Sequence, residues 1–376
     1  MTPAGIYLHI PFCRSRCSYC DFATGLYQTE LAESYIEALI KEVASARDWS
    51  FPVDTIYFGG GTPSLLSAMQ LDRIMGILQK SFAITSDAEI TMEMNPGTVT
   101  LPGLREFRNL GINRASFGAQ TFDDHELARL GRSHTTTDTL QTFRDLRTAG
   151  FENVSFDLIA GLPGQSLTRW EENVDQAIML RPEHLSFYLL EVHAGTPLAD
   201  HIRKGLQPVP DDDLAGVMYE RMLERAATAE YEHYEISNLC LPGRSSRHNT
   251  KYWTGAPYFG FGCSAHSYDG VRRRWSNERD IGKYLAAIEN DVSSIAEQRN
   301  LSDEDIRAEA VFLGMRLMHG LDALRFRQLF CVDLFEEYKD DLQRFSEAGL
   351  VEFEGDMIRL TRAGALLSNE VFAAFV

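Results

Sequence analysis

The sequence has 376 residues, which exceeds the usual size of one domain and favours a large domain with a smaller one. Its 36 Lys and Arg against 54 Asp and Glu give a formal charge of −18, which disfavours nucleic acid and anionic lipid as partners. No run approaches the ~20 apolar residues of a membrane span, and no basic segment precedes the first apolar residues. We therefore expect a cytoplasmic protein without an integral membrane segment.

Short apolar or β-branched runs, each followed by loop residues, predict six strands at residues 6–10, 55–58, 89–93, 114–117, 154–159 and 185–190. Between them, apolar residues recur at helical spacing at residues 31–43, 71–82 and 170–178. Alternating strands and helices imply parallel strands joined by right-handed crossovers. Since no G-x-G-x-x-G turn follows any strand, we predict an α/β fold with a full or partial (β/α) barrel.

The pattern changes after residue 300. Helical patterns at 303–318 and 333–348 precede Gly349, a predicted hairpin at 350–354 and 357–361, and a last helix at 365–375. This order predicts a small winged-helix-like α+β domain, and the negative charge argues against DNA binding by it. The expected domains are a barrel core at 1–235, a linking segment at 236–300 and a C-terminal domain at 301–376.

Three cysteines lie within eight residues, spaced C-x3-C-x2-C at Cys13, Cys17 and Cys20. Thiolates at this spacing suit an iron–sulfur cubane, whereas structural zinc takes four ligands and no nearby Cys or His completes such a set. Three thiolates on a four-iron cluster leave one iron open to a small molecule. The sequence therefore predicts a [4Fe–4S] cluster on these residues.

The other cysteines, Cys240, Cys263 and Cys331, are scattered, and we expect them to be buried small residues. Arg14 and Arg16 lie between the cluster cysteines. They either offset the negative charge of the cluster or are solvated loop residues.

Polar and glycine residues follow the predicted strands, where a β/α barrel gathers its ligand site. They include His9, the segment G-G-G-T-P-S at 59–64, Glu93 and Asp157. Three consecutive glycines permit close approach of a ligand amino group or phosphate. We expect these residues to surround a ligand beside the cluster.

The cysteine spacing, with aromatic Tyr19 before the last Cys, resembles the signature of the radical S-adenosylmethionine (SAM) superfamily. The resemblance implies a partial (β/α) barrel in which the open iron binds the amino and carboxylate groups of SAM. Reduction of the cluster then cleaves SAM to a 5′-deoxyadenosyl radical.

More narrowly, the chain resembles the oxygen-independent coproporphyrinogen III oxidase-like family. The resemblance rests on the segments H-I-P-F-C, G-G-G-T-P-S, E-x-N-P-G, G-L-P-G-Q and R-H-N-T-K-Y-W. It places the SAM contacts on Tyr7, Tyr19, Gly60, Gly61, Thr62, Glu93, Gln120, Arg132 and Asp157.

One departure separates two branches of that family. The decarboxylating oxidases carry a further Cys two positions after the last cluster ligand and a longer N-terminal extension. Here that position is Phe22, and twelve residues precede Cys13. The resemblance therefore favours the branch of heme chaperones.

The H-N-x-x-Y-W segment at 248–253 points to heme. By resemblance, His248 is the candidate axial ligand, and Tyr252 and Trp253 would pack against the macrocycle. Without the family, a His in this setting is more often a hydrogen-bonded structural residue. His266 is a second candidate ligand, and the arginines at 272–274 either pair with heme propionates or are solvated.

The expected function is a heme chaperone that binds the cluster, SAM and heme and delivers heme to an acceptor apo-protein, with a homodimer left open. One alternative is a radical SAM enzyme that decarboxylates coproporphyrinogen III. Another is a radical SAM enzyme for an unrelated substrate, in which the H-N-x-x-Y-W segment is only core.

Overall fold

A computed structural model of the chain describes residues 2–46 and 51–375. One large sheet has the strand order β14-β13-β12-β11-β1-β4-β5-β6-β7-β8-β10-β9. Because its two edge strands do not pair, the barrel is open, and the expected partial barrel is confirmed. The six predicted strands are its parallel centre: β1 (Ala4–Ile10), β4 (Val53–Gly60), β5 (Ile84–Met94), β6 (Arg114–Gln120), β7 (Val154–Ala160) and β8 (His184–Leu189).

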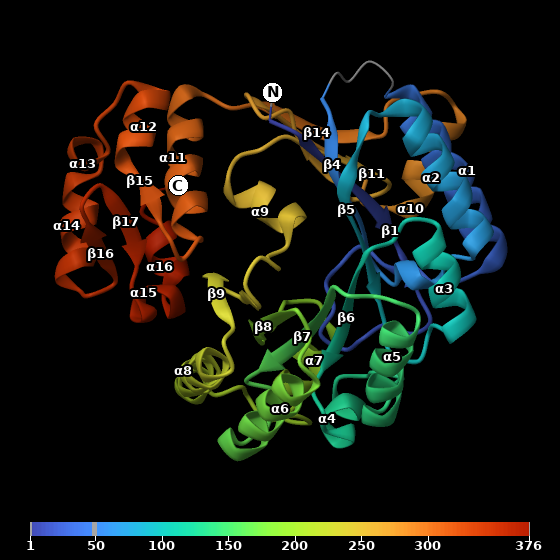
Figure 1. Cartoon of the computed structure of the whole chain (residues 1–376), viewed down its shortest axis with the longest axis horizontal. Coiled ribbons are helices and arrows are strands. Elements are labelled where there is room, and N and C mark those ends of the chain that lie inside the picture. Colours follow the sequence, from blue (N-terminus) through green and yellow to red (C-terminus); the bar gives the residue numbers. More distant parts are fainter. Residues whose placement is uncertain (1, 47–50, 376) are drawn as a thin grey trace.

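Helices cover the outer face of these strands (Figure 1). The helix α2 shows why they form: a capping box of Ser67 and Gln70 starts it, and Leu71, Ile74 and Leu78 bury one face. The helices of this part are α1 (Thr29–Ser45), α2 (Ala68–Ser81), α3 (Leu101–Asn109), α4 (Asp124–Arg129), α5 (Thr136–Thr148), α6 (Leu167–Leu180), α7 (Pro197–Arg203) and α8 (Asp212–Thr228).

The segment 236–300, expected as a link, extends this sheet at both edges. Strand β11 pairs in parallel with β1, and β10 pairs antiparallel with β8. Its helix α9 (Arg247–Trp253), which carries the H-N-x-x-Y-W residues, lies between the sheet and the C-terminal domain (Figure 1). Strand β9 (Glu232–Glu235) precedes this segment, whose other elements are β10 (Asn238–Cys240), β11 (Tyr258–Phe261), β12 (His266–Tyr268), β13 (Arg273–Asn277), α10 (Ile281–Glu289) and β14 (Ile295–Asn300).

The C-terminal part has its own core, built around Phe326, Leu342 and Ile358. Its hairpin of β16 (Val351–Glu354) and β17 (Met357–Leu360) was predicted, whereas β15 (Leu321–Asp322), which completes the sheet, was not. The winged-helix-like domain is confirmed. Its helices are α11 (Asp303–Met315), α12 (Ala323–Phe330), α13 (Leu334–Glu337), α14 (Lys339–Glu347), α15 (Arg362–Leu366) and α16 (Ser368–Phe372), so the helices predicted at 333–348 and 365–375 are each broken in two.

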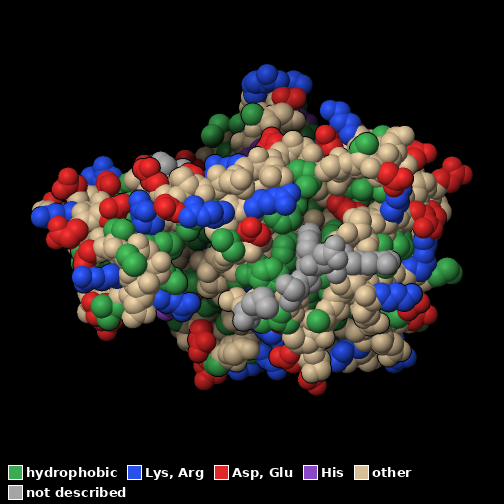
Figure 2. Space-filling model, turned by 90° about the horizontal axis from the view of Figure 1, so that it is seen from above, with side chains coloured by type: hydrophobic (Ala, Val, Ile, Leu, Met, Phe, Trp, Pro, Cys, Tyr) green, Lys and Arg blue, Asp and Glu red, His purple; other side chains and the backbone are tan. Residues whose placement is uncertain are grey.

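Ion pairs join the C-terminal domain to the sheet edge. Arg272 pairs with Asp303, and Arg274 Nη2 lies 2.6 Å from Glu309 Oε2. These two arginines are thus paired within the chain, which neither expectation for residues 272–274 anticipated. Acidic and basic side chains intermingle over the upper face of the molecule (Figure 2). Among the described residues, no helix is long and apolar enough to cross a membrane.

Candidate functional site

The loop that carries the three cysteines is closed by a small parallel ladder of β2 (Phe12–Cys13) and β3 (Gly25–Leu26). Its far side is tethered as well, because Ser18 N donates to Leu130 O at 2.9 Å and Leu198 N donates to Ser18 O at 2.8 Å. We call residues 13–24 the cluster loop. Backbone bonds therefore hold this loop against two different parts of the barrel.

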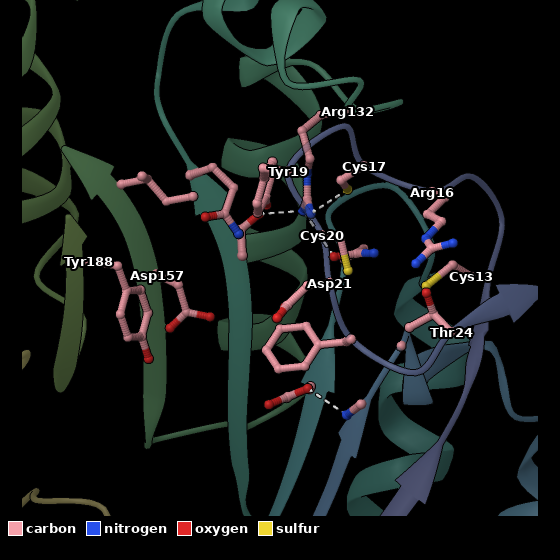
Figure 3. A pocket seen from close by; sticks show the side chains of 18 of the residues that line it. Cys13, Arg16, Cys17, Tyr19, Cys20, Asp21, Thr24, Arg132, Asp157 and Tyr188 are labelled. Carbon is pink, nitrogen blue, oxygen red and sulfur yellow. Dashed lines mark hydrogen bonds between the residues drawn. The ribbon is translucent and has the colours of Figure 1, made fainter. Parts of the chain in front are cut away.

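The cluster loop borders a pocket of about 420 Å³ at the carboxyl ends of the barrel strands. Figure 3 shows the cysteines on one side of this pocket and Asp157 and Tyr188 on the other. Most of the predicted site residues line it: Cys13, Cys17, Tyr19, Cys20, Gly60, Gly61, Glu93, Gln120, Arg132 and Asp157.

The donor set at the cluster loop fits a cubane. In the part of the chain that the structure describes, no three Cys, His, Asp or Glu side chains converge on a single metal ion. Convergence is not required, because the thiolates of a four-iron cluster bind separate irons. Thr62 Oγ1 donates to Cys13 Sγ at 3.6 Å and Arg132 Nη1 donates to Cys17 Sγ at 3.5 Å. Both contacts would offset negative charge on the sulfurs of a bound cluster.

Asn95 is a site residue that the sequence prediction omitted. Its Nδ2 donates to Thr62 Oγ1 at 2.8 Å, and its Oδ1 accepts from Arg132 Nη2 at 2.9 Å. Arg132 Nη2 also donates to Gly118 O at 2.7 Å. Asn95 thus fixes both side chains that contact the cysteine sulfurs. Its place in E-x-N-P-G, directly after a strand, was the available signal.

Two carboxyl groups, Glu93 from β5 and Asp157 from β7, reach the pocket. Tyr57 Oη donates to Glu93 Oε1 at 2.8 Å and Gly60 N donates to Oε2 at 3.1 Å. Burial raises the pKa of Glu93 to about 7, the nearby Asp157 charge adds to this, and the Tyr57 hydrogen bond opposes it. Burial also raises the pKa of Asp157. The pocket therefore holds a carboxyl group that ionises near neutral pH.

Sequence reasoning also missed Tyr188. Asp157 pairs in register with Ser186, so the alternation of β8 brings residue 188 to the same side two positions later. The tyrosine lines the pocket there. The predicted strand at 185–190 already contained this information, but without the register its inward face was undetermined.

The glycine triplet serves packing. A Cβ on Gly60, whose φ is +110°, would lie 2.7 Å from His9 Cε1, and one on Gly61 would lie 2.7 Å from Phe12 O. The expected reason for these glycines, close approach of a ligand, is thus not needed to explain them. They give room to a histidine ring and to the backbone at the start of the cluster loop.

Three predicted contacts do not line the pocket. Thr62 is buried behind Cys13, and Tyr7 lies below, with its hydroxyl 3.1 Å from His9 Nδ1. His248 is 1% exposed; its Nδ1 lies 2.9 Å from Thr55 Oγ1 and its Nε2 2.9 Å from Tyr252 Oη. Burial lowers the pKa of His248 to about 3. In this conformation neither of its ring nitrogens is free to bind iron.

The remaining candidates lie elsewhere. His266 is exposed on β12 and does not line the pocket, and Arg316 stacks 4.2 Å above the ring of Trp253. Cys240 and Cys263 are buried as expected. The same expectation is wrong for Cys331, which is exposed because it ends α12 in a left-handed conformation at the surface.

Family models match two parts of the chain: the radical SAM superfamily at residues 7–177 and the HemN C-terminal domain at residues 301–367. The heme chaperone HemW of Bacillus subtilis is 35% identical over 373 residues, covering 98% of both chains. HemW of Escherichia coli is 31% identical over 392 residues, covering 100% of this chain and 99% of the relative.

Among solved structures, coproporphyrinogen III oxidase (HemN) from Escherichia coli, a radical SAM enzyme, superposes with a TM-score of 0.87 at 22% identity. The match covers 100% of this chain and 90% of that one and shows a shared fold. Membership of the superfamily implies a [4Fe–4S] cluster and SAM, which agrees with the donor set described above. The full-length identity to several relatives shows that the chain belongs to the radical SAM superfamily and, within it, to the family of the heme chaperone HemW.

Proposed function

We propose that this protein is a heme chaperone that holds a [4Fe–4S] cluster on Cys13, Cys17 and Cys20, binds SAM beside it, and delivers heme to an acceptor apo-protein. The observation that carries the proposal is a pocket in which three thiols face polar groups from the strand ends. The heme chaperone function of its full-length relatives, which their name states, supports the heme cargo. We further propose that the protein acts in the cytoplasm, as a monomer or a homodimer.

When bound, the cluster supplies an open iron for SAM and the electron for its cleavage. The chain's own residues would hold the rest of the molecule. Glu93, once ionised, would accept hydrogen bonds from the ammonium group, and Gln120 and Asp157 would accept them from ribose hydroxyls. Arg132 and Tyr19 would close the wall next to the cysteines.

The heme would lie across the pocket mouth. There the cluster loop exposes 63% of Phe22, and β8 exposes 43% of Tyr188. These two exposed rings at the pocket mouth form an apolar surface that a flat macrocycle could cover. Arg16, exposed on the same rim, would pair with a propionate.

Axial ligation by His248, the expectation from the family resemblance, carries a structural requirement. Helix α9 would have to move so that the His248 imidazole loses its hydrogen bond with Thr55 or with Tyr252. Heme placed at the pocket mouth does not require this movement. Substitution of His248 distinguishes the two arrangements, because only axial ligation makes the heme spectrum depend on its imidazole.

The experiment is anaerobic reconstitution of the full chain with iron and sulfide, followed by heme titration with and without SAM. We expect a cluster spectrum, SAM binding that depends on it, saturable heme binding, and transfer of that heme to an apo-hemoprotein. Absence of heme binding would refute the proposal. Formation of protoporphyrinogen from coproporphyrinogen III at enzymatic rates would replace it with the oxidase alternative.

A further inference from the structure

Three aromatic rings form a column beneath the pocket. The ring of His248 on α9 stacks on Tyr57 of β4, with centroids 5.1 Å apart and planes at 29°. Tyr57 in turn stacks on Tyr7 of β1, at 6.1 Å and 23°. The column therefore connects α9 with β4 and β1. Strand β4 leads to the glycine triplet, and β1 leads to the cluster loop.

The hydroxyl groups of this column hold the floor of the pocket. Tyr57 Oη donates to Glu93 Oε1 at 2.8 Å. His9 Nε2 lies 2.9 Å from Ala23 O, so this nitrogen donates, and Nδ1 accepts from Tyr7 Oη at 3.1 Å. One tyrosine thus orients the pocket carboxyl, and the other supports the histidine that ties down the cluster loop.

The three rings pack directly against two glycines. A Cβ on Gly59 would lie 2.9 Å from Tyr7 Cε2 and 3.0 Å from Tyr57 Cε1. A Cβ on Gly5 would lie 3.0 Å from His248 Cε1. Glycine at both positions is what allows the rings to pack this closely. Any other residue would have to displace a ring.

Helix α9 is itself fixed to the strands. The carboxylate of Glu89 accepts from Arg247 N at 3.2 Å and from His248 N at 3.1 Å, and so caps the first turn of the helix. Lys251 Nζ lies 2.6 Å from Asp54 Oδ1 and donates to Pro3 O at 2.8 Å. These contacts set the height and rotation at which the His248 ring meets Tyr57.

We propose that His248 is a positioning residue for the SAM pocket: its ring holds Tyr57 in place, and Tyr57 orients the carboxyl group of Glu93. This inference rests on the proposed SAM site and assigns the H-N-x-x-Y-W helix a role in that site. If the ring is lost, Tyr57 gains room to tilt and Glu93 loses its hydroxyl partner. SAM affinity falls as a consequence, while the cysteines remain able to hold the cluster.

The test compares two substitutions in the reconstituted full chain. His248→Phe keeps a flat ring against Tyr57, and His248→Gln keeps a hydrogen-bonding group but removes the ring. We expect the phenylalanine variant to bind SAM within about twofold of the native chain and the glutamine variant about tenfold more weakly, with equal cluster content. The SAM-induced change in the electron paramagnetic resonance spectrum of the reduced cluster should follow the same order.

Tyr57→Phe provides an independent arm, because it keeps the ring and removes only the hydroxyl that reaches Glu93. We expect it to weaken SAM binding as much as His248→Gln. If a His248 variant fails to fold, this variant still tests whether the Tyr57–Glu93 hydrogen bond supports SAM binding. His319→Gln, at an exposed histidine outside the column, is the matched control and should leave SAM affinity unchanged.

Native SAM affinity in His248→Gln or in Tyr57→Phe would overturn the inference. So would loss of the native heme spectrum in both His248 variants with SAM binding intact, because that pattern assigns the imidazole to iron. If the native chain holds a full cluster and binds no SAM, the proposed function has failed instead. That failure appears before any variant is compared.

Discussion

The two ends of the barrel differ in what lies between the ends of the strands: a pocket at one end and a helix at the other. At the carboxyl ends of the strands, Glu93, Asp157 and the three cysteines face an open pocket. At the amino ends, helix α9 fills the space, and its side chains are tied to the strands by Thr55 and Asp54. Binding chemistry is therefore concentrated at one end, and the other end stabilises the fold.

The difference shows that the location of a residue in the barrel decides whether its side chain is available to bind a ligand. Imidazole in a heme-protein motif suggests iron ligation, but His248 lies at the closed end, where its nitrogens already have partners. Thiols at the open end are half-buried and lack disulfide partners, as a cluster requires. Position in the barrel separates the two groups of residues more clearly than their chemistry does.

Removal of a cluster cysteine should have the largest effect. Cys17→Ser is expected to abolish the stable cluster after anaerobic reconstitution, lowering bound iron from about four per chain to nearly none. Iron and sulfide analysis with the visible spectrum measures this. Cys331→Ser, at an exposed cysteine, is the control and should keep full iron content. One tightly bound zinc ion in the native chain would contradict the cluster assignment.

At the closed end, Lys251→Met should lower the free energy of unfolding by about 1–3 kcal/mol, because it removes the nearer of the two cations paired with Asp54, which is only 17% exposed, and leaves Arg247 Nη2 at 3.2 Å as its remaining partner. Urea denaturation of the full chain measures the loss. Arg225→Met removes more exposed ion pairs, with Asp175 and Glu171, and should cost no more than about 1 kcal/mol. Equal losses in the two variants would mean that the Lys251–Asp54 ion pair does not fix α9 to the strands.

At the open end, Glu93 should make stability depend on pH. Its pKa is raised in the folded chain to about 7 from 4.5, so the folded state binds more protons between these values. The free energy of unfolding therefore falls as pH rises through this window, by at most ~3 kcal/mol.

Glu93→Gln removes the titrating group, so its stability relative to the native chain should be higher at pH 8 than at pH 5. Urea denaturation at the two pH values, without SAM, checks this. A constant difference between the two chains would show that Glu93 ionises normally. Asp157→Asn, which removes the neighbouring charge, should lower the pKa of Glu93 and so narrow the pH range over which stability changes.

The smallest effect on stability is expected at the pocket rim. Phe22→Ala should change the free energy of unfolding by no more than about 0.5 kcal/mol, since 63% of the side chain is exposed. Heme affinity should nevertheless fall about tenfold if the ring covers the macrocycle. Titration of the reconstituted variant measures this. Unchanged heme affinity would remove Phe22 from the proposed heme surface.

The sequence by itself determined the parallel core of the barrel and the cluster loop. Strands such as β1 are buried along almost their whole length, so their sequences are nearly continuous apolar runs that can be recognised locally. The spacing of Cys13, Cys17 and Cys20 predicts a cluster site within eight residues, and this prediction requires no knowledge of the rest of the chain.

Tertiary structure decided which side chains meet. The parallel pairing of β11 with β1, the contact of His248 with Tyr57 and the need for Gly59 all join segments distant in sequence. Periodicity carries no information on such contacts, because it reports which face of one element is buried and not what lies opposite. The packing of the H-N-x-x-Y-W helix against the strands is therefore a property of the tertiary structure alone.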